Sequence, residues 1–177
     1  MLKFIGDLRS LVLALWLGAA CFFAFAVAPS AFSVLASRDM AGSLVSRTLM
    51  IVNLSGIVIG GFLLATSFLP GRSARNLLLW AERILLTVLT LAAVIGQFVI
   101  ALWMSQIRMS VGKPMEELAL DDPMRIQFDS LHVWSVNVLV AGMIAAALTY
   151  FLLSYRARHT EIKEIKRTEP GLPDFKF

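Results

Sequence analysis

Charged residues are scarce in this sequence. Lysine, arginine, aspartate and glutamate make up only 16% of its 177 residues, whereas 58% are hydrophobic. A soluble domain of this length needs more charge to cover its surface. The apolar residues also gather in four long runs, at 10–36, 44–69, 76–107 and 131–155. Each run exceeds the roughly 20 helical residues that cross a bilayer, so the sequence predicts an all-α integral membrane bundle of four transmembrane helices.

Residues 1–168 are expected to form this single transmembrane domain. The only sizeable loop is the outer segment 108–130. Within it, the stretch KPMEELAL has proline and acids before its leucines, which predicts a short amphipathic helix. Residues 169–177 contain two prolines and a glycine, so we expect an extended C-terminal tail.

The sequence has only one cysteine and none of the common catalytic motifs. The single cysteine, Cys21, excludes an intramolecular disulfide and is expected to pack as a small hydrophobic residue. The sequence has no nucleophile elbow, HExxH, CxxC, P-loop or dinucleotide-binding glycine motif. We therefore predict a protein that is not an enzyme and has no cofactor.

The distribution of lysine and arginine predicts how the chain crosses the membrane. Four spans place both termini and the 70–75 loop on one side, which carries most of the basic residues: Lys3, Arg9, Arg72, Arg75, Arg83, Arg156, Arg158, Lys163, Lys166, Arg167 and Lys176. The other side carries Arg38, Arg47, Arg108, Lys113 and Arg125, diluted by five acids. The positive-inside rule then predicts an inner-membrane protein with both termini in the cytoplasm. The bilayer is the expected partner and nucleic acid is not, because no basic stripe is interleaved with aromatic residues.

Charged residues are expected to be absent from the middle of every span. This absence argues against a proton-coupled or ion-coupled pump, which usually carries an ionisable group inside the membrane. Glu82 and Arg83 lie near the start of the third run, beside Trp80, and we expect both at the membrane interface. An alternative is that Glu82 reaches Arg75 or Arg9.

Uncharged polar residues in the runs lie at one depth. Counted from the outer ends, Asn53, Gln97, Ser135 and Asn137 fall roughly 6–16 Å below the outer surface. Pro29 falls in the same layer and removes one backbone hydrogen bond from the first helix. The sequence therefore predicts a polar layer in the outer half of the bundle.

Two interpretations of this polar layer are open. In the first, the amides hydrogen-bond between helices, at about 1 kcal/mol each, and small residues allow the helices to pack closely: Gly18, Gly56, Gly60, Gly61, Gly96 and Gly142. In the second, the layer lines a small vestibule on the outer side that binds or passes a solute, with Arg108 as a further member.

The fourth run opens with the stretch FDSLHVWSVN, which is residues 128–137. The preceding DDPM predicts that Asp122 caps this helix and that Pro123 is its first residue, two turns before the membrane. Spacings of four, four and three place four side chains on one face: Met124, Phe128, His132 and Ser135. Asn137 lies about 140° around the helix from His132 and is expected to face elsewhere.

Methionine is concentrated on the outer side. Six of the eight methionines map to outer loops or helix ends: Met40, Met50, Met104, Met109, Met115 and Met124. Thioether and imidazole groups together bind soft cations such as Cu(I), so His132 with Met50, Met104 or Met109 is a candidate copper site. His132 could also serve as one axial ligand of a haem. Because methionine commonly fills gaps in a core, copper and haem remain alternatives to a protein without cofactor.

At FDSLHVWSVN the chain resembles a bacterial family of unknown function grouped with transmembrane protein 205. The last helix of that family opens with F-x-x-x-H-x-x-S-x-x-N, which Phe128, His132 and Ser135 match, while Asn137 falls one residue short. The first half is similar too, at these positions: Trp16, Gly18, Phe22, Phe23, Phe25, Pro29, Phe32, Arg38 and AGSLVSR at 41–47. The resemblance implies a four-helix membrane protein without an established activity. That family is also distantly similar to copper-resistance D-type proteins and to a haem-biosynthetic protoporphyrinogen oxidase. This similarity implies the metal and haem alternatives.

These observations predict a non-enzymatic membrane protein whose outer polar layer binds or passes a small solute or supports a partner. One alternative is a structural accessory subunit of a larger membrane complex. The other is a haem-binding or copper-binding protein that uses His132.

Overall fold

The computed structural model describes residues 2–68 and 77–168, and within these ranges it contains four long helical rods and no strand. The first rod joins α1 (Leu2–Phe22), η1 (Phe23–Val27) and α2 (Ala28–Val34), and the second is α3 (Arg38–Thr66). The third joins α4 (Leu77–Ile95), η2 (Gly96–Ile100) and α5 (Ala101–Val111), and the fourth is α6 (Pro123–Thr168). The predicted all-α fold is confirmed. The 70–75 loop and the tail 169–177 lie outside the described residues.

All four rods are long and apolar enough to span a membrane. The candidate spans are Gly6–Val34, Arg38–Thr66, Leu77–Val111 and Pro123–Arg156, with mean hydropathy between 2.1 and 2.5. Large apolar side chains cover the outside of the bundle, including Leu15, Val58 and Phe151. A surface of this kind is stable against lipid tails and not against water. The chain is therefore a multi-pass membrane protein.

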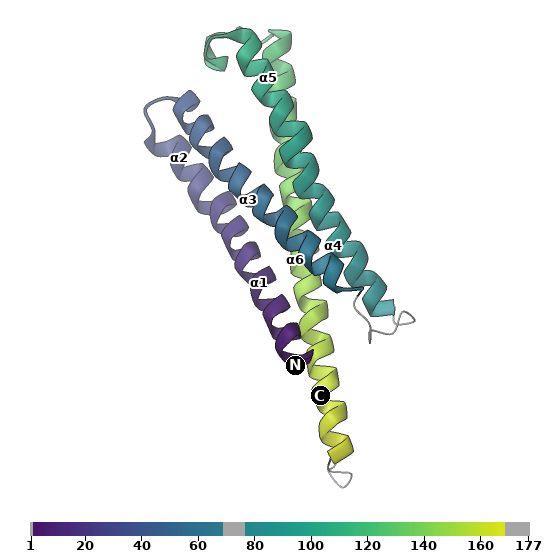
Figure 1. Cartoon of the computed structure of the whole chain (residues 1–177). Coiled ribbons are helices and arrows are strands. Elements are labelled where there is room, and N and C mark those ends of the chain that lie inside the picture. Colours follow the sequence, from purple (N-terminus) through teal and green to yellow (C-terminus); the bar gives the residue numbers. More distant parts are fainter. Residues whose placement is uncertain (1, 69–76, 169–177) are drawn as a thin grey trace.

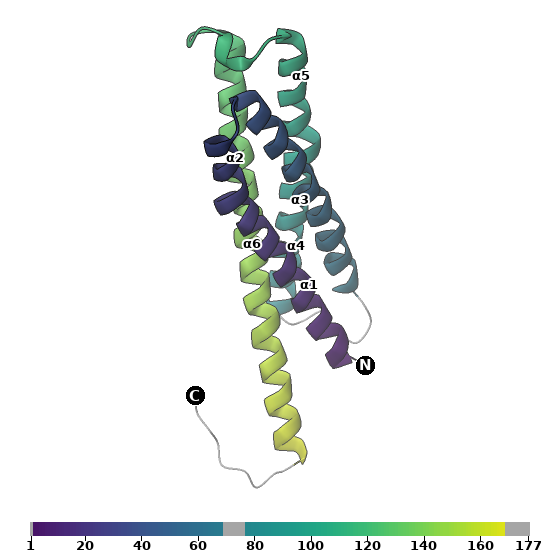
Figure 2. The same ribbon diagram turned by 90° about the vertical axis from the view of Figure 1, so that its left-hand side faces the viewer.

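The rods alternate in direction, so the bundle has two distinct ends (Figure 1). We call the end at which α1 begins the proximal end, and the end that holds α2 and the α5–α6 connection the distal end. Toward the distal end, α2 and the beginning of α3 diverge from α5 (Figure 1). At the proximal end, α6 continues past the beginning of α1 (Figures 1 and 2), because its 46 residues measure ~69 Å along the axis.

Local signals set the helix ends at the distal side. α3 begins at Arg38, ahead of the apolar run predicted from 44, because the hydroxyl of Ser37 accepts a hydrogen bond from the Met40 N–H at 3.2 Å. The predicted cap of α6 is confirmed, since the Met124 N–H donates to Asp122 Oδ1 at 2.8 Å. The amphipathic helix predicted in KPMEELAL is wrong. That stretch holds only the single 3-10 turn Met115–Glu117, which is too short to bury an apolar face.

Small residues bring the helices into close contact. A Cβ atom on Gly56 would lie 3.0 Å from the indole of Trp16, and one on Gly60 would lie 2.6 Å from Thr90 Oγ1. The Trp16 indole N–H also donates to the Val52 carbonyl of α3 at 3.1 Å. Gly18 and Gly61 have nothing within 4 Å of their ideal Cβ positions, so close packing is confirmed for Gly56 and Gly60 and is wrong for Gly18 and Gly61.

Candidate functional site

A cleft of about 780 Å³ lies in the distal half, bounded by the first two rods on one side and by η2, α5 and α6 on the other. Its walls are mostly apolar, with Phe23, Leu49 and Leu139 among the lining residues. Clefts of roughly 300–1,000 Å³ with apolar walls and a few polar groups are typical ligand sites. The distal cleft is therefore the candidate functional site.

Three residues of the predicted polar layer lie together in the distal cleft. Asn53 of α3, Gln97 of η2 and Ser135 of α6 all line it. Asn53 is 5% exposed, and its Nδ2 lies 3.2 Å from the ideal Cβ position of Gly96, so a larger residue there would displace the amide. Asn137 is exposed and is not among the lining residues, as its 140° offset from His132 implies.

Gln97 contributes a hydrogen-bond acceptor to the distal cleft. Its Oε1 atom is buried and accepts no hydrogen bond from the part of the chain that the structure describes. A buried acceptor without a donor is unfavourable by about 1–3 kcal/mol. Gln97 therefore borders the ligand-free cleft with an acceptor that the described residues leave unsatisfied.

Two π-helical segments border the distal cleft. η1 precedes Pro29, and the Ala28 N–H donates to the Phe23 carbonyl five residues earlier. η2 begins at Gly96, and the Ala101 N–H donates in the same way to the Gly96 carbonyl. Pro29 explains the first segment, because proline has no N–H for the regular ladder and its ring displaces the preceding turn. Such one-turn widenings re-aim nearby side chains and are frequent at functional sites.

Arg108 of α5 crosses the mouth of the distal cleft toward two other helices. Its Nη1 lies 3.4 Å from the Ser46 hydroxyl of α3, and its guanidinium lies 5.0 Å from the ring centroid of Phe128 on α6. Gly42 of α3 makes room for it, because a Cβ there would lie 3.1 Å from Arg108 Nη2. Arg108 therefore links α5 to α3 and to α6 through contacts with uncharged groups.

The remaining predicted residues divide between the cleft and its surroundings. His132 and Met50 are exposed and Met104 is half-buried, and all three line the distal cleft. Met109 is 74% exposed and is not among the lining residues. Within residues 2–68 and 77–168, no group of three or more His, Cys, Asp or Glu side chains is placed to hold a metal ion.

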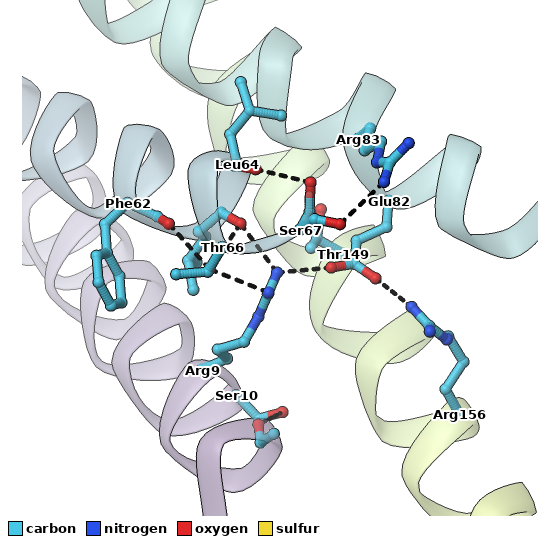
Figure 3. A network of polar contacts seen from close by, with 12 residues as sticks. Arg9, Ser10, Phe62, Leu64, Thr66, Ser67, Glu82, Arg83, Thr149 and Arg156 are labelled. Atoms are coloured by element: carbon cyan, nitrogen blue, oxygen red, sulfur yellow. Dashed lines mark hydrogen bonds and ion pairs between the residues drawn. The ribbon is translucent and has the colours of Figure 1, made fainter. Parts of the chain in front are cut away.

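At the proximal end, a buried carboxylate joins two arginines (Figure 3). Glu82 of α4 accepts a hydrogen bond from Arg9 Nη2 of α1 at 2.6 Å and another from Arg156 Nη1 of α6. Arg9 also donates to the Leu63 carbonyl and to Thr66 Oγ1 of α3, both at 3.0 Å. We call Arg9, Glu82 and Arg156 the proximal triad. Through these bonds it ties all four rods together.

The proximal triad corrects one expectation. Glu82 is 0% exposed and Arg9 is 1% exposed, so Glu82 is buried against the other helices instead of extending to water near Trp80, while all three charges still lie near the ends of their spans. Of the two alternative partners, Arg9 does bond Glu82, whereas Arg75 lies outside the described residues. Arg83 does have aromatic neighbours, since its guanidinium lies 5.4 Å from the Trp80 ring centroid and 4.1 Å from that of Phe68.

Sequence reasoning gave the Glu82–Arg9 contact only as an alternative and missed Arg156 and the burial, because the members of the proximal triad are far apart in the chain. Arg9 and Glu82 are separated by 73 residues, and each lies near the end of an apolar run, where snorkelling to the interface is the usual outcome. The available signal was that one acid and two bases lie at the same predicted end of three different helices. A carboxylate shared by two guanidiniums satisfies several charged hydrogen bonds at once, which is what burial of charge requires.

Comparison with known proteins gives a family and no activity. Residues 11–112 match the family described as a domain of unknown function (DUF4149). This match covers more than half of the chain and ends before α6, so it does not include the motif at 128–137. The resemblance to transmembrane protein 205 stays a prediction. No curated protein and no solved structure has significant similarity to the chain.

Proposed function

The chain belongs to the DUF4149 family, whose function is unknown, and we propose that it is a non-enzymatic membrane protein that holds a small amphipathic molecule in the distal cleft. The observation that carries this proposal is the composition of the cleft. Apolar side chains form most of its wall, while Asn53, Gln97 and Ser135 enter it from three different rods. An amphipathic ligand matches both parts, because its apolar body fills the cleft and its polar groups bond the amides.

The structural difference between the two ends of the bundle supports the proposal. The proximal triad ties the four rods together at one end, whereas α2 and α3 diverge from α5 at the other (Figure 1). A site that must admit a ligand benefits from one rigid end and one end with fewer tertiary constraints. The proximal triad thus preserves the bundle while the distal cleft opens.

The membrane orientation follows from the charge distribution. We place both termini in the cytoplasm and the distal cleft in the outer half of the inner membrane, because the proximal side carries most of the lysine and arginine. A ligand would then enter from the outer leaflet or from the space outside it.

Native mass spectrometry of the protein in mild detergent tests the proposal. Ser135→Phe fills the distal cleft, and Ser43→Phe places the same ring on an exposed position of α3 outside the cleft. We expect a co-purified amphiphile in the wild type and in Ser43→Phe, and its loss in Ser135→Phe. Equal ligand content in both variants would contradict the proposal. A stoichiometric partner protein with an empty cleft would support an accessory subunit instead.

A further inference from the structure

We propose that Arg108 is the anchor for a negatively charged headgroup, so that the ligand is an anionic amphiphile with a single apolar chain. This inference rests on the proposed function of the distal cleft and names its ligand class. The headgroup chemistry is a phosphate or a carboxylate, held at the mouth of the cleft while the chain lies between the apolar walls.

The surroundings of Arg108 leave its charge without a counter-ion. Its contacts are the hydroxyl of Ser46 at 3.4 Å and the ring of Phe128, both neutral. No carboxylate in the described part of the chain lies at ion-pair distance from its guanidinium. The side chain is partly buried, so water compensates its charge less well than at an open surface. A ligand anion supplies the missing counter-charge.

The guanidinium at the mouth suits a partner that offers two oxygens side by side. A guanidinium carries five N–H donors in a fixed fork that matches the spacing of carboxylate and phosphate oxygens. The only hydrogen bond of the Arg108 side chain to the described residues is the one to Ser46, which leaves donors for a headgroup. Gly42 and Phe128 hold the guanidinium in place by close approach and by a cation–π contact.

The other charged residues of the cleft do not replace Arg108 as the anchor. The basic residues Arg38 and Arg47 and the acids Asp39, Glu116 and Asp129 are all exposed, so water and salt screen their charges. Arg125 is partly buried but donates to the Leu118 carbonyl at 2.7 Å.

The size of the cleft favours a single chain. Its volume of about 780 Å³ is that of sites for drug-sized molecules. A long-chain alkyl phosphate or fatty acid belongs to this size class, whereas a complete phospholipid with two chains does not.

Calorimetric titration of the full-length protein in an uncharged detergent tests the inference. The probes are dodecyl phosphate, dodecanoate and uncharged dodecanol, which share one chain and differ in the headgroup. Arg108→Gln removes the charge. Arg83→Gln is the matched control, because Arg83 is also partly buried, with two aromatic rings and the Ser67 carbonyl as its partners.

We expect both anions to bind the wild type more tightly than dodecanol does. Arg108→Gln should weaken the anions about 10-fold, since one charge-assisted contact is lost, while dodecanol binding stays the same and shows that the variant is folded. Arg83→Gln should leave all three affinities unchanged. Tighter binding of the phosphate than of the carboxylate would identify a phospholipid-derived headgroup, and the reverse a fatty acid.

These titrations distinguish a failure of the headgroup assignment from a failure of the proposed cleft function. If dodecanol binds as tightly as the anions, or if Arg108→Gln keeps full anion affinity, the headgroup assignment is overturned and the proposed cleft function stands. If no probe binds the wild type, or if Ser135→Phe leaves binding intact, the proposed function itself fails. Should Arg108→Gln lose dodecanol binding as well, the comparison of anions with dodecanol on the wild type decides the inference.

Discussion

Replacing Glu82 by glutamine should destabilise the bundle more than any other single loss of charge in the described part of the chain. Glutamine keeps the shape of the side chain and removes only its charge. Arg9, which is 1% exposed, would then keep its buried positive charge without the Glu82 carboxylate that accepts its 2.6 Å hydrogen bond. A buried charge without a partner is unfavourable because neither water nor a neighbour compensates it.

The expected loss of unfolding free energy is about 3 kcal/mol. Removing one partner of a buried ion pair typically costs 3–5 kcal/mol, and we take the low end because glutamine can still accept one hydrogen bond. Arg156 is 23% exposed, so its own charge stays partly hydrated. Arg156→Gln should therefore cost less than Glu82→Gln, on the order of 1 kcal/mol.

Unfolding in mixed micelles with increasing dodecyl sulfate, followed by tryptophan fluorescence, measures these free energies. Arg83→Gln is the control, because it removes a guanidinium near the same end that is not bonded to Glu82. In the double variant Glu82→Gln with Arg9→Met, the methionine removes the positive charge of Arg9, which Glu82→Gln alone leaves buried beside a neutral side chain. We expect the double variant to lose less stability than the sum of the two single changes.

A loss below about 1 kcal/mol for Glu82→Gln would refute the reasoning, because losses of that size are typical of exposed pairs. Strict additivity in the double variant would refute the coupling of Arg9 to Glu82. Either result would mean that water reaches the proximal triad and compensates its charges.

Three further outcomes follow from contacts inside the bundle, and thermal unfolding in detergent measures each of them. Gly60→Ala should lower stability by about 1–3 kcal/mol, because its new methyl group would lie 2.6 Å from Thr90 Oγ1, whereas Gly61→Ala has open space and should raise it by up to about 1 kcal/mol. Equal effects of these two changes would contradict the packing. Trp16→Phe should cost about 1 kcal/mol through its lost hydrogen bond to α3, and no change would mean that this bond contributes nothing. Gln97→Leu should stabilise the ligand-free protein by about 1 kcal/mol, because it removes a buried acceptor without a donor, and a destabilised variant would show that this acceptor has a partner.

The four spanning helices and the cap at Asp122 were predictable because they depend on local properties of the chain. An apolar run longer than a bilayer is thick must form a helix to satisfy its backbone in lipid. The side chain of Asp122 reaches an N–H only two residues ahead. Neither feature needs knowledge of the other helices.

The candidate site was only partly predictable. Counting residues from the outer ends gave the common depth of Asn53, Gln97 and Ser135, since the rise per residue of a helix is constant. The rotation of each helix about its own axis decides which side chains face one another, and packing sets that rotation. For this reason the structure was needed to bring these three residues into one cleft and to place Asn137 outside it.

By itself, the sequence determined the number of helices in the described part of the chain, their apolar surfaces and the shared level of Asn53, Gln97 and Ser135 along the bundle, because hydrophobicity and helical rise act within one segment. The tertiary structure alone decided the partners of the charged residues. Arg9 and Glu82 each lie close enough to a helix end to reach water, and only the packing of α1 and of α4 against α3 and α6 brought the two side chains together. The energy of a buried charge depends on a partner from another helix, and no single segment contains that information.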